Sequence, residues 1–201
     1  LIVAVKALRK KGITPIAPGE KDRWPGMYWY DILAMRMAGA KEAQNALKYP
    51  ALFERQVFQD AAEKLIELNS LGAFSKEAFE WGFVEMSDSF RKGEAAMMYQ
   101  GDWVNEIIEA EDSPTRGKVT VVPFPVVTGG SGSAYEFLGG NLDSFYIRAN
   151  TAYPKDAVEV LLRISERAAR QGEINSSGIS CWKTDPEQPI TRTPLATQSI
   201  A

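Results

Sequence analysis

The chain has 201 residues, 45% of them hydrophobic, which is enough to bury a core in one large domain or in two lobes. Its 23 Lys and Arg residues against 26 Asp and Glu give a net charge of −3, which leaves no basic surplus for a nucleic-acid partner. Histidine is absent and Cys181 is the single cysteine, which excludes imidazole catalysis and thiolate or imidazole metal sites, so we expect no metal and no cofactor.

The first segment, LIVAVKALRKKG, reads as a helix followed by a short strand. Ile2, Val5 and Leu8 fall on one helical stripe, and Gly12 can take the left-handed conformation that ends a helix. Residues 13–18 then predict a strand interrupted by prolines. The segment opens without an initiating Met or a capping residue, so we expect it to belong to a longer or processed protein.

Residues 24–38 combine an aromatic cluster with an apolar helical pattern. Trp24 stands before Pro25, a position that disfavours helix, so we predict that Trp24 lies in a loop. Tyr28 and its successors continue into a helix. Because a helix buries only one face, some of the aromatic rings are expected to stay accessible.

The middle of the chain predicts a helix, a strand and a second helix. Residues 54–71 carry apolar side chains at helical spacing and end at Gly72. The run 95–99 is short and apolar enough for a buried strand. Asp102 is suited to cap a following helix whose first turn contains Trp103.

The remaining segments complete an alternating pattern. Residues 118–127 and 144–150 resemble strands, residues 128–133 (TGGSGS) have the composition of a flexible loop, and residues 153–171 predict a helix opened by Pro154. Strands and helices that alternate in this way favour an α/β layered architecture.

Carboxylates, glycine runs and Cys181 each suggest a catalytic or phosphate-binding site, but each also has a simpler structural explanation. Carboxylates such as Asp31, Asp102 and Glu106 could form a hydrolytic pair, yet acids at such positions usually cap or solvate helices. The glycine runs lack the order of phosphate-binding loops, and a turn is the simpler account of Gly140. No histidine is present to activate Cys181 as a nucleophile.

Tryptophan and tyrosine rings are better candidates for a ligand site. Their flat apolar faces stack on the C–H faces of a sugar while nearby Asp, Asn or Glu groups bond to its hydroxyls. Trp24, Trp103 and Trp182 each stand in a loop or at the start of an element, where binding residues concentrate. Because any tryptophan is more often part of a core, the residues alone leave both interpretations open.

Five motifs follow one another along nearly the whole chain: KKGITPIAPGEKDRWPGMYWYDILAMRMAG, SFRKGEAAMMYQGDWV, VPFPVV, FLGGNLDSFYIRANTAYPKDAVEVLLRIS and GISCWKTD. The most specific is F-x-x-G-x-A-A-M-x-x-x-G-x-W, which runs from Phe90 to Trp103. In this order the motifs resemble the extracellular solute-binding proteins of ABC importers, in the carbohydrate-binding group related to maltose-binding protein.

The resemblance implies an α/β fold of two lobes, the type II periplasmic-binding-protein-like fold, incomplete in this chain because the family is longer. It assigns residues 1–118 mainly to the second, C-terminal lobe and residues 119–136 to a crossover strand and Gly-rich loop. Residues 137–170 then supply a strand and a helix to the first lobe, and residues 171–201 return to the second. Without most of the first lobe, the chain is expected to bind sugar weakly or not at all.

The resemblance further implies a receptor that is not an enzyme. Such a receptor captures a sugar or oligosaccharide in the cleft between its lobes and signals closure to an ABC permease in the membrane. It is expected to be a monomer with no nucleic-acid partner, located outside the cell or in a periplasm, with lipid anchoring left open.

The ligand-binding residues that the resemblance carries over to this sequence are Trp24, Tyr28, Asp102, Trp103, Gly140, Asn141 and Trp182. Some relatives have proline at the position of Asp102, so a sugar contact and a helix cap both stay open there. Cys181 and Trp182 stand where the family often has proline, which leaves the detail of that loop open. Two further interpretations are a carboxylate-dependent glycoside hydrolase and a structural or interaction domain without a small ligand.

Overall fold

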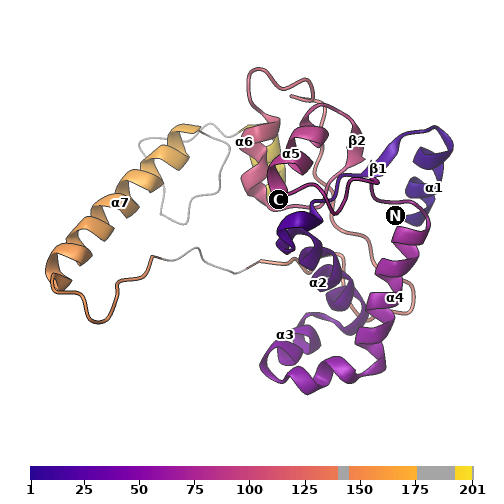
Figure 1. Cartoon of the computed structure of the whole chain (residues 1–201), viewed down its shortest axis with the longest axis horizontal. Helices are drawn as coiled ribbons and strands as arrows, with labels where there is room; N and C mark the ends of the chain where they lie inside the picture. Colours follow the sequence, from indigo (N-terminus) through magenta and orange to yellow (C-terminus); the bar gives the residue numbers. More distant parts are fainter. Residues whose placement is uncertain (140–144, 176–192, 201) are drawn as a thin grey trace. The chain divides into compact units, whose positions relative to one another are not determined.

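The computed structural model describes residues 1–139, 145–175 and 193–200, which divide into two compact units (Figure 1). The first unit contains residues 1–101, 112–115 and 122–138, and the second contains residues 102–111, 116–121 and the described residues from 139 onward. The elements of the first unit are α1 (Ile2–Lys10), β1 (Thr14–Ile16), η1 (Glu20–Asp22), α2 (Trp24–Ala38), α3 (Ala40–Lys48), η2 (Pro50–Glu54), α4 (Gln56–Ser70), α5 (Phe83–Arg91) and β2 (Ala95–Met97).

The strands β1 and β2 pair in parallel, with Thr14 opposite Ala95 and Ile16 opposite Met97. Both strands were predicted, and Ile16 makes a further parallel bridge to Phe74. Because the strands run in the same direction, the segments that follow them meet at one edge of the sheet.

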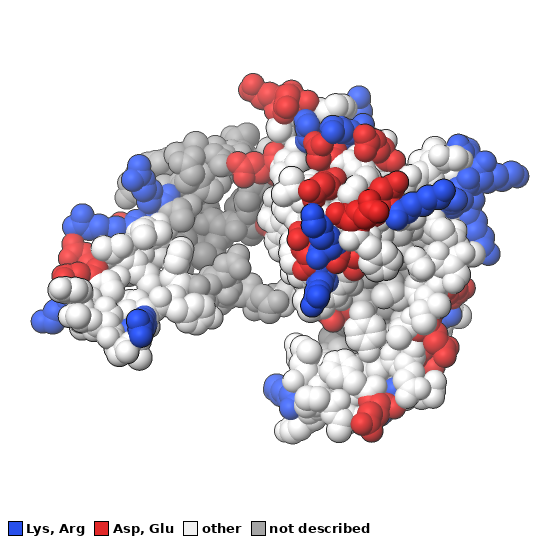
Figure 2. Space-filling model, viewed as in Figure 1, with Lys and Arg blue, Asp and Glu red and all other residues white. Residues whose placement is uncertain are grey.

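Helix α1 ends as its sequence predicts. Val5 is fully buried, and Gly12 takes a φ of 72°, which lets the chain reverse after the helix. The amide of Ile13 returns to the carbonyl of Leu8 at 3.0 Å and closes the turn. Lys and Arg side chains gather at the right of Figure 2, on the side where α1 lies. Arg9 and Lys10, in the last turn of α1, complement the negative end of the helix dipole.

Helix α2 is the centre of the core of the first unit. It packs against α3 and α4, and its second half is buried nearly all round (Figure 1). Helix α4 contributes Phe58 and Ala61 from the predicted 54–71 segment, whereas Ile66 of the same helix is 64% exposed. Apolar burial of this extent is the main stabilising term of the unit.

The Gly-rich segment 128–133 packs on the end of α2 instead of forming a flexible loop. The amides of Ser131 and Gly132 donate to the carbonyls of Met37 and Arg36, each at 2.9 Å. These bonds satisfy carbonyls that the end of a helix leaves without partners. A Cβ at Gly132 would lie 2.3 Å from the carbonyl oxygen of Met35, so only glycine allows this approach.

We expect Gly132→Ala to lower the free energy of unfolding by about 1–3 kcal/mol, because the added methyl forces the loop away from α2. Urea denaturation followed by circular dichroism measures the change. Gly139→Ala is the matched control, since no atom lies within 4 Å of the Cβ it would add. Equal stability of the two variants would contradict the close packing of the loop.

The buried Arg36 holds the same segment from inside. Its side chain is 0% exposed, and its guanidinium donates to the carbonyls of Phe124, Ala134 and Glu136 at 3.0, 3.4 and 2.8 Å. The Glu136 side chain in turn accepts from the amide of Ala40 at 3.3 Å. One arginine thus joins α2 to three points of a segment almost one hundred positions later.

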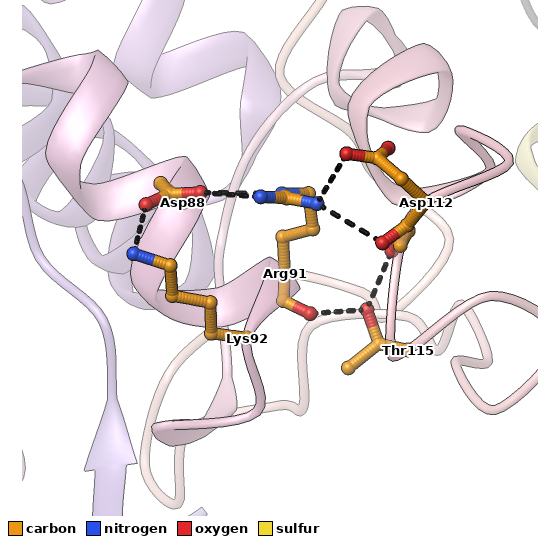
Figure 3. Close-up of polar contacts among 6 residues, drawn as sticks. Asp88, Arg91, Lys92, Asp112 and Thr115 are labelled. Atoms are coloured by element: carbon orange, nitrogen blue, oxygen red, sulfur yellow. Dashed lines mark hydrogen bonds and ion pairs between the residues drawn. The ribbon is translucent and has the colours of Figure 1, made fainter.

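A second polar cluster fastens residues 112–115 to the end of α5 (Figure 3). Asp88 accepts from Arg91 at 2.9 Å and from Lys92 at 2.6 Å, and Arg91 reaches the Asp112 carboxylate at 3.4 Å. The hydroxyl of Thr115 donates to the carbonyl of Arg91 at 3.0 Å. The bonds to Lys92 and Arg91 lower the pKa of Asp88.

A lowered pKa makes the contribution of Asp88 to stability dependent on pH. It is fully present above the ordinary aspartate pKa of 3.8 and is lost as the pH falls through the lower folded-state pKa. We therefore expect the urea midpoints of Asp88→Asn and wild type to differ at neutral pH and to converge below pH 3.8. If the urea midpoints of wild type and Asp88→Asn differ by the same amount at every pH, the ionised Asp88 carboxylate is not the source of the difference.

The second unit contains η3 (Asp102–Val104), α6 (Asn105–Ile108), α7 (Pro154–Asn175) and α8 (Pro194–Ile200). Helix α7 confirms the helix predicted from Pro154. The side chain of Gln198 in α8 accepts from the hydroxyl of Thr120 at 3.0 Å and the amide of Val121 at 2.8 Å.

The strands predicted at 118–127 and 144–150 are not found among the described residues. β1 and β2 are the strands of the described chain, and neither 118–127 nor 145–150 pairs with them. The assignment of segments to the two lobes stays a prediction.

Candidate functional site

The parallel pairing of β1 and β2 brings the segments after both strands to one edge of the sheet. β1 leads into η1 and the first turns of α2, and β2 leads into Tyr99. In α/β proteins ligands bind outside the carboxyl ends of parallel strands, because several connections converge there. This edge is the candidate functional site of the first unit.

Three aromatic rings lie together at the start of α2 and α5: Trp24, Tyr28 and Phe83, which we call the aromatic face. The centroids of Trp24 and Tyr28 lie 5.6 Å apart in an edge-to-face arrangement, and those of Trp24 and Phe83 lie 5.3 Å apart. All three side chains are partly buried. Rings that support one another and remain accessible offer the kind of flat apolar surface on which a sugar stacks.

Asp22 positions Phe83 in the aromatic face. Its Oδ2 atom accepts from the amide of Phe83 at 2.7 Å, and the Glu85 carboxylate accepts from the amide of Gly82 at 3.0 Å. These carboxylates satisfy amides at the start of α5 and suit the positive end of its dipole. The cap thereby holds Phe83 beside Trp24.

The prediction that Trp24 lies in a loop is wrong, because α2 begins at Trp24. Arg23 precedes it with a φ of 65°, and Pro25 occupies the first turn, where its missing amide proton costs no hydrogen bond. The steric restriction that disfavours a helical residue before proline therefore does not prevent a helix from starting at Trp24. As a result Trp24 and Tyr28, four positions apart, share one face of the helix.

The aromatic residues of α2 divide between surface and core. Trp29 is 5% exposed, and its ring packs against Phe74, Tyr99 and Phe124 at centroid distances of 5.3, 5.4 and 5.9 Å. Trp24, by contrast, remains partly accessible. This division agrees with the expectation that some aromatic rings stay accessible in the first half of α2, whereas the second half of the helix is buried nearly all round.

Two partly buried carboxyl groups accompany the aromatic face. Burial raises the pKa of both Glu20 and Asp31. The Glu20 carboxylate fills the space beside Gly26 that a Cβ would occupy. Partial removal of a carboxylate from water is costly unless another group bonds to it.

Tyr99 brings a phenol to the same edge from β2. Burial raises the pKa of its hydroxyl, the Arg36 charge lowers it, and the Asp31 charge raises it. Its ring also contacts Phe124 at 5.3 Å between centroids. Phe83 and Tyr99 were not predicted as site residues, and Asp31 was predicted only as a candidate hydrolytic acid. The spacing of Asp31 from Trp24 and the place of Tyr99 at the end of the apolar run 95–99 are the sequence signals for these two residues.

Asp102 and Trp103 lie in η3 of the second unit, in a 3₁₀ turn followed by the short helix α6. Trp103 is 48% exposed, while Val104 and Ile108 next to it are buried. The helix predicted after Asp102 is therefore present but short, and Trp103 offers its ring at the surface.

Gly140, Asn141 and Trp182 lie outside the described residues, so their roles stay predictions. Within the described ranges, no three His, Cys, Asp or Glu side chains gather closely enough to hold a metal ion. No helix in the part of the chain that the structure describes has the length and apolar character needed to span a membrane.

A parallel strand pair with aromatic and acidic side chains at its carboxyl edge is the architecture of an α/β protein that binds ligands. Residues 1–162 match the model of the bacterial extracellular solute-binding proteins, and the chain belongs to this family. It is 22% identical over 157 residues to an uncharacterized ABC transporter extracellular-binding protein of Pyrococcus horikoshii, a match that covers 78% of this chain and 33% of that protein.

The solved structures that are similar to this chain include the following two. The first comes from a study of xylan utilization by the thermophilic bacterium Caldanaerobius polysaccharolyticus and has a TM-score of 0.89 at 33% identity, covering 98% of this chain and 50% of that chain. The second is a chitin oligosaccharide binding protein with a TM-score of 0.58 at 26% identity, covering 61% of this chain and 31% of that chain.

The chain therefore spans from 31% to 50% of the length of these relatives. The predicted fold class is confirmed: this is the α/β solute-binding fold, and its described part is mostly helical with few strands.

Proposed function

We propose that this chain is part of the sugar-binding receptor of an ABC importer, and that the aromatic face supplies a stacking surface for the sugar. The observation that carries the proposal is the pair of accessible rings, Trp24 and Tyr28, on one face of α2 at the carboxyl edge of a parallel sheet. Family membership and the xylan and chitin oligosaccharide contexts of the two similar structures support it.

The stacking mechanism follows from the chemistry of the rings. An indole or phenol face replaces water over the apolar C–H face of a pyranose, and nearby polar groups bond to its hydroxyls. In the whole protein, ligand capture would shift the equilibrium between open and closed arrangements of the lobes, and the closed form would engage a membrane permease. The receptor would act outside the cytoplasm and leave its ligand unchanged.

The other predicted contacts keep their proposed roles. Trp103 would stack on the sugar, and Asp102 would accept from its hydroxyls. Gly140, Asn141 and Trp182 stay predicted sugar contacts.

Saturation-transfer NMR of the whole protein, of which this chain is a part, with xylotriose and with triacetylchitotriose tests the proposal. We expect transfer to the ring C–H protons of at least one trisaccharide and no release of reducing ends on long incubation. Absence of transfer to both sugars would contradict the proposal, and accumulating reducing ends would favour a glycoside hydrolase.

A further inference from the structure

Asp31 lies on the same side of α2 as the aromatic face. It follows Trp24 by seven positions and Tyr28 by three, spacings that place all three side chains along one stripe of the helix. The Asp31 side chain is partly buried, so some of its surface still reaches solvent. A ligand stacked on the rings would therefore lie next to a carboxylate.

The carboxylate of Asp31 has no partner within the described residues. Burial alone raises the pKa of Asp31, and no hydrogen bond or neighbouring cation offsets that effect. Arg36, five positions further along α2, donates hydrogen bonds to the carbonyls of Phe124, Ala134 and Glu136. Because Asp31 is half-buried and does not pair with Arg36, its carboxylate oxygens can still accept hydrogen bonds from a ligand.

The hydroxyl of Tyr99 stands in the same environment. The Tyr99 ring packs against Trp29, two positions before Asp31 on α2, at 5.4 Å between centroids. Burial raises the pKa of the hydroxyl, the Arg36 charge lowers it, and the charges of Asp31 and Tyr28 raise it. Among the described residues no hydrogen bond reaches this hydroxyl, whereas the hydroxyl of Tyr30 donates to the carbonyl of Phe58 at 3.3 Å. Of these two tyrosines, only Tyr30 has a hydroxyl that is hydrogen-bonded within the described part of the protein.

We propose that Asp31 and Tyr99 determine ligand specificity by binding neighbouring hydroxyl groups of the sugar that stacks on Trp24 and Tyr28. The carboxylate accepts from hydroxyls, and the phenol both donates and accepts. This arrangement selects uncharged saccharides with free adjacent hydroxyls and opposes uronic acids, whose carboxylate would meet Asp31. The inference rests on the proposed function and deepens it.

Affinity measurements on Asp31→Asn and Tyr99→Phe test the inference, with dissociation constants from saturation-transfer titrations of the tighter-binding trisaccharide. We expect Asp31→Asn to weaken binding by about tenfold or more, since a hydrogen bond to a charged group is lost. Tyr99→Phe should weaken it by about fivefold, and the double variant by less than the product of the two. Trigalacturonate should bind wild type more weakly than the neutral sugar.

Two control variants separate recognition from structure. Asp60→Asn removes a helical carboxylate that is bonded to Gln56 at 2.8 Å, and Tyr30→Phe removes the internal hydroxyl. Both should leave the dissociation constant within about twofold of wild type. The thermal midpoint of Asp31→Asn should equal or exceed that of wild type, because a partly desolvated charge without a partner is removed.

The outcomes distinguish the two proposals. If wild type binds neither trisaccharide, the proposed function and this inference both fail. If wild type binds but Asp31→Asn and Tyr99→Phe bind equally well, the inference alone fails. If Asp31→Asn binds more weakly only in proportion to a lowered thermal midpoint, Asp31 has a structural role and the inference also fails.

Discussion

Arg36→Ala is expected to lower the free energy of unfolding by about 3–5 kcal/mol. The substitution leaves the buried carbonyls of Phe124, Ala134 and Glu136 without their donor and opens a cavity beside α2. The segment from Phe124 to Glu136 should then detach from the helix. Urea denaturation measures the loss, and hydrogen exchange should show faster exchange of the Ser131 and Gly132 amides.

Arg55→Ala is the control for this change. Arg55 forms an exposed ion pair with Glu42 between α3 and the start of α4, and such surface pairs contribute only about 0–1 kcal/mol. A cost for Arg36→Ala no greater than that of Arg55→Ala would mean that the buried guanidinium does not hold the later segment.

Trp24→Ala is expected to abolish measurable saturation transfer to the trisaccharides while the fold persists. The indole is partly exposed, so its removal forfeits its contacts with Tyr28 and Phe83, worth about 1–2 kcal/mol of stability, but leaves no closed cavity. Circular dichroism and urea denaturation check the fold on the samples used for NMR.

Trp29→Ala provides the contrast on the same helix. Its ring is sealed among Phe74, Tyr99 and Phe124, so we expect a loss of about 3–5 kcal/mol and binding that fails only because the protein unfolds. If Trp24→Ala is as destabilising as Trp29→Ala, the rings at the start of α2 belong to the core and carry no sugar.

The local elements of this fold were predictable where one physical signal dominates. The glycine at position 12 ended α1, and the short apolar runs around Ile16 and Ala95 formed β1 and β2. Helix α3 was not predicted, because the stretch that forms it is largely polar and Ala46 is its single buried residue. The docking of residues 128–133 was also missed, because a Gly-rich composition permits both a flexible loop and a close backbone contact.

The candidate site was predictable only in part. The sequence pointed to Trp24 and Tyr28, and the structure places their rings together. Phe83 joins them through the cap that Asp22 makes across many residues of sequence, a contact that no local pattern encodes. Whether Trp24 is accessible and Trp29 is core depends on which side of α2 faces α4 and β2, and that is decided by tertiary packing.

The pairing of Thr14 with Ala95 also affects how the protein forms in the cell. A parallel partner that emerges from the ribosome so long after the first strand imposes a high contact order, and loops of this length close slowly. Until the second strand appears, Trp29 lacks the ring of Tyr99 that packs against it. The core around α2 therefore stays incomplete until translation has passed the second strand, which leaves the nascent chain dependent on protection from aggregation during that interval.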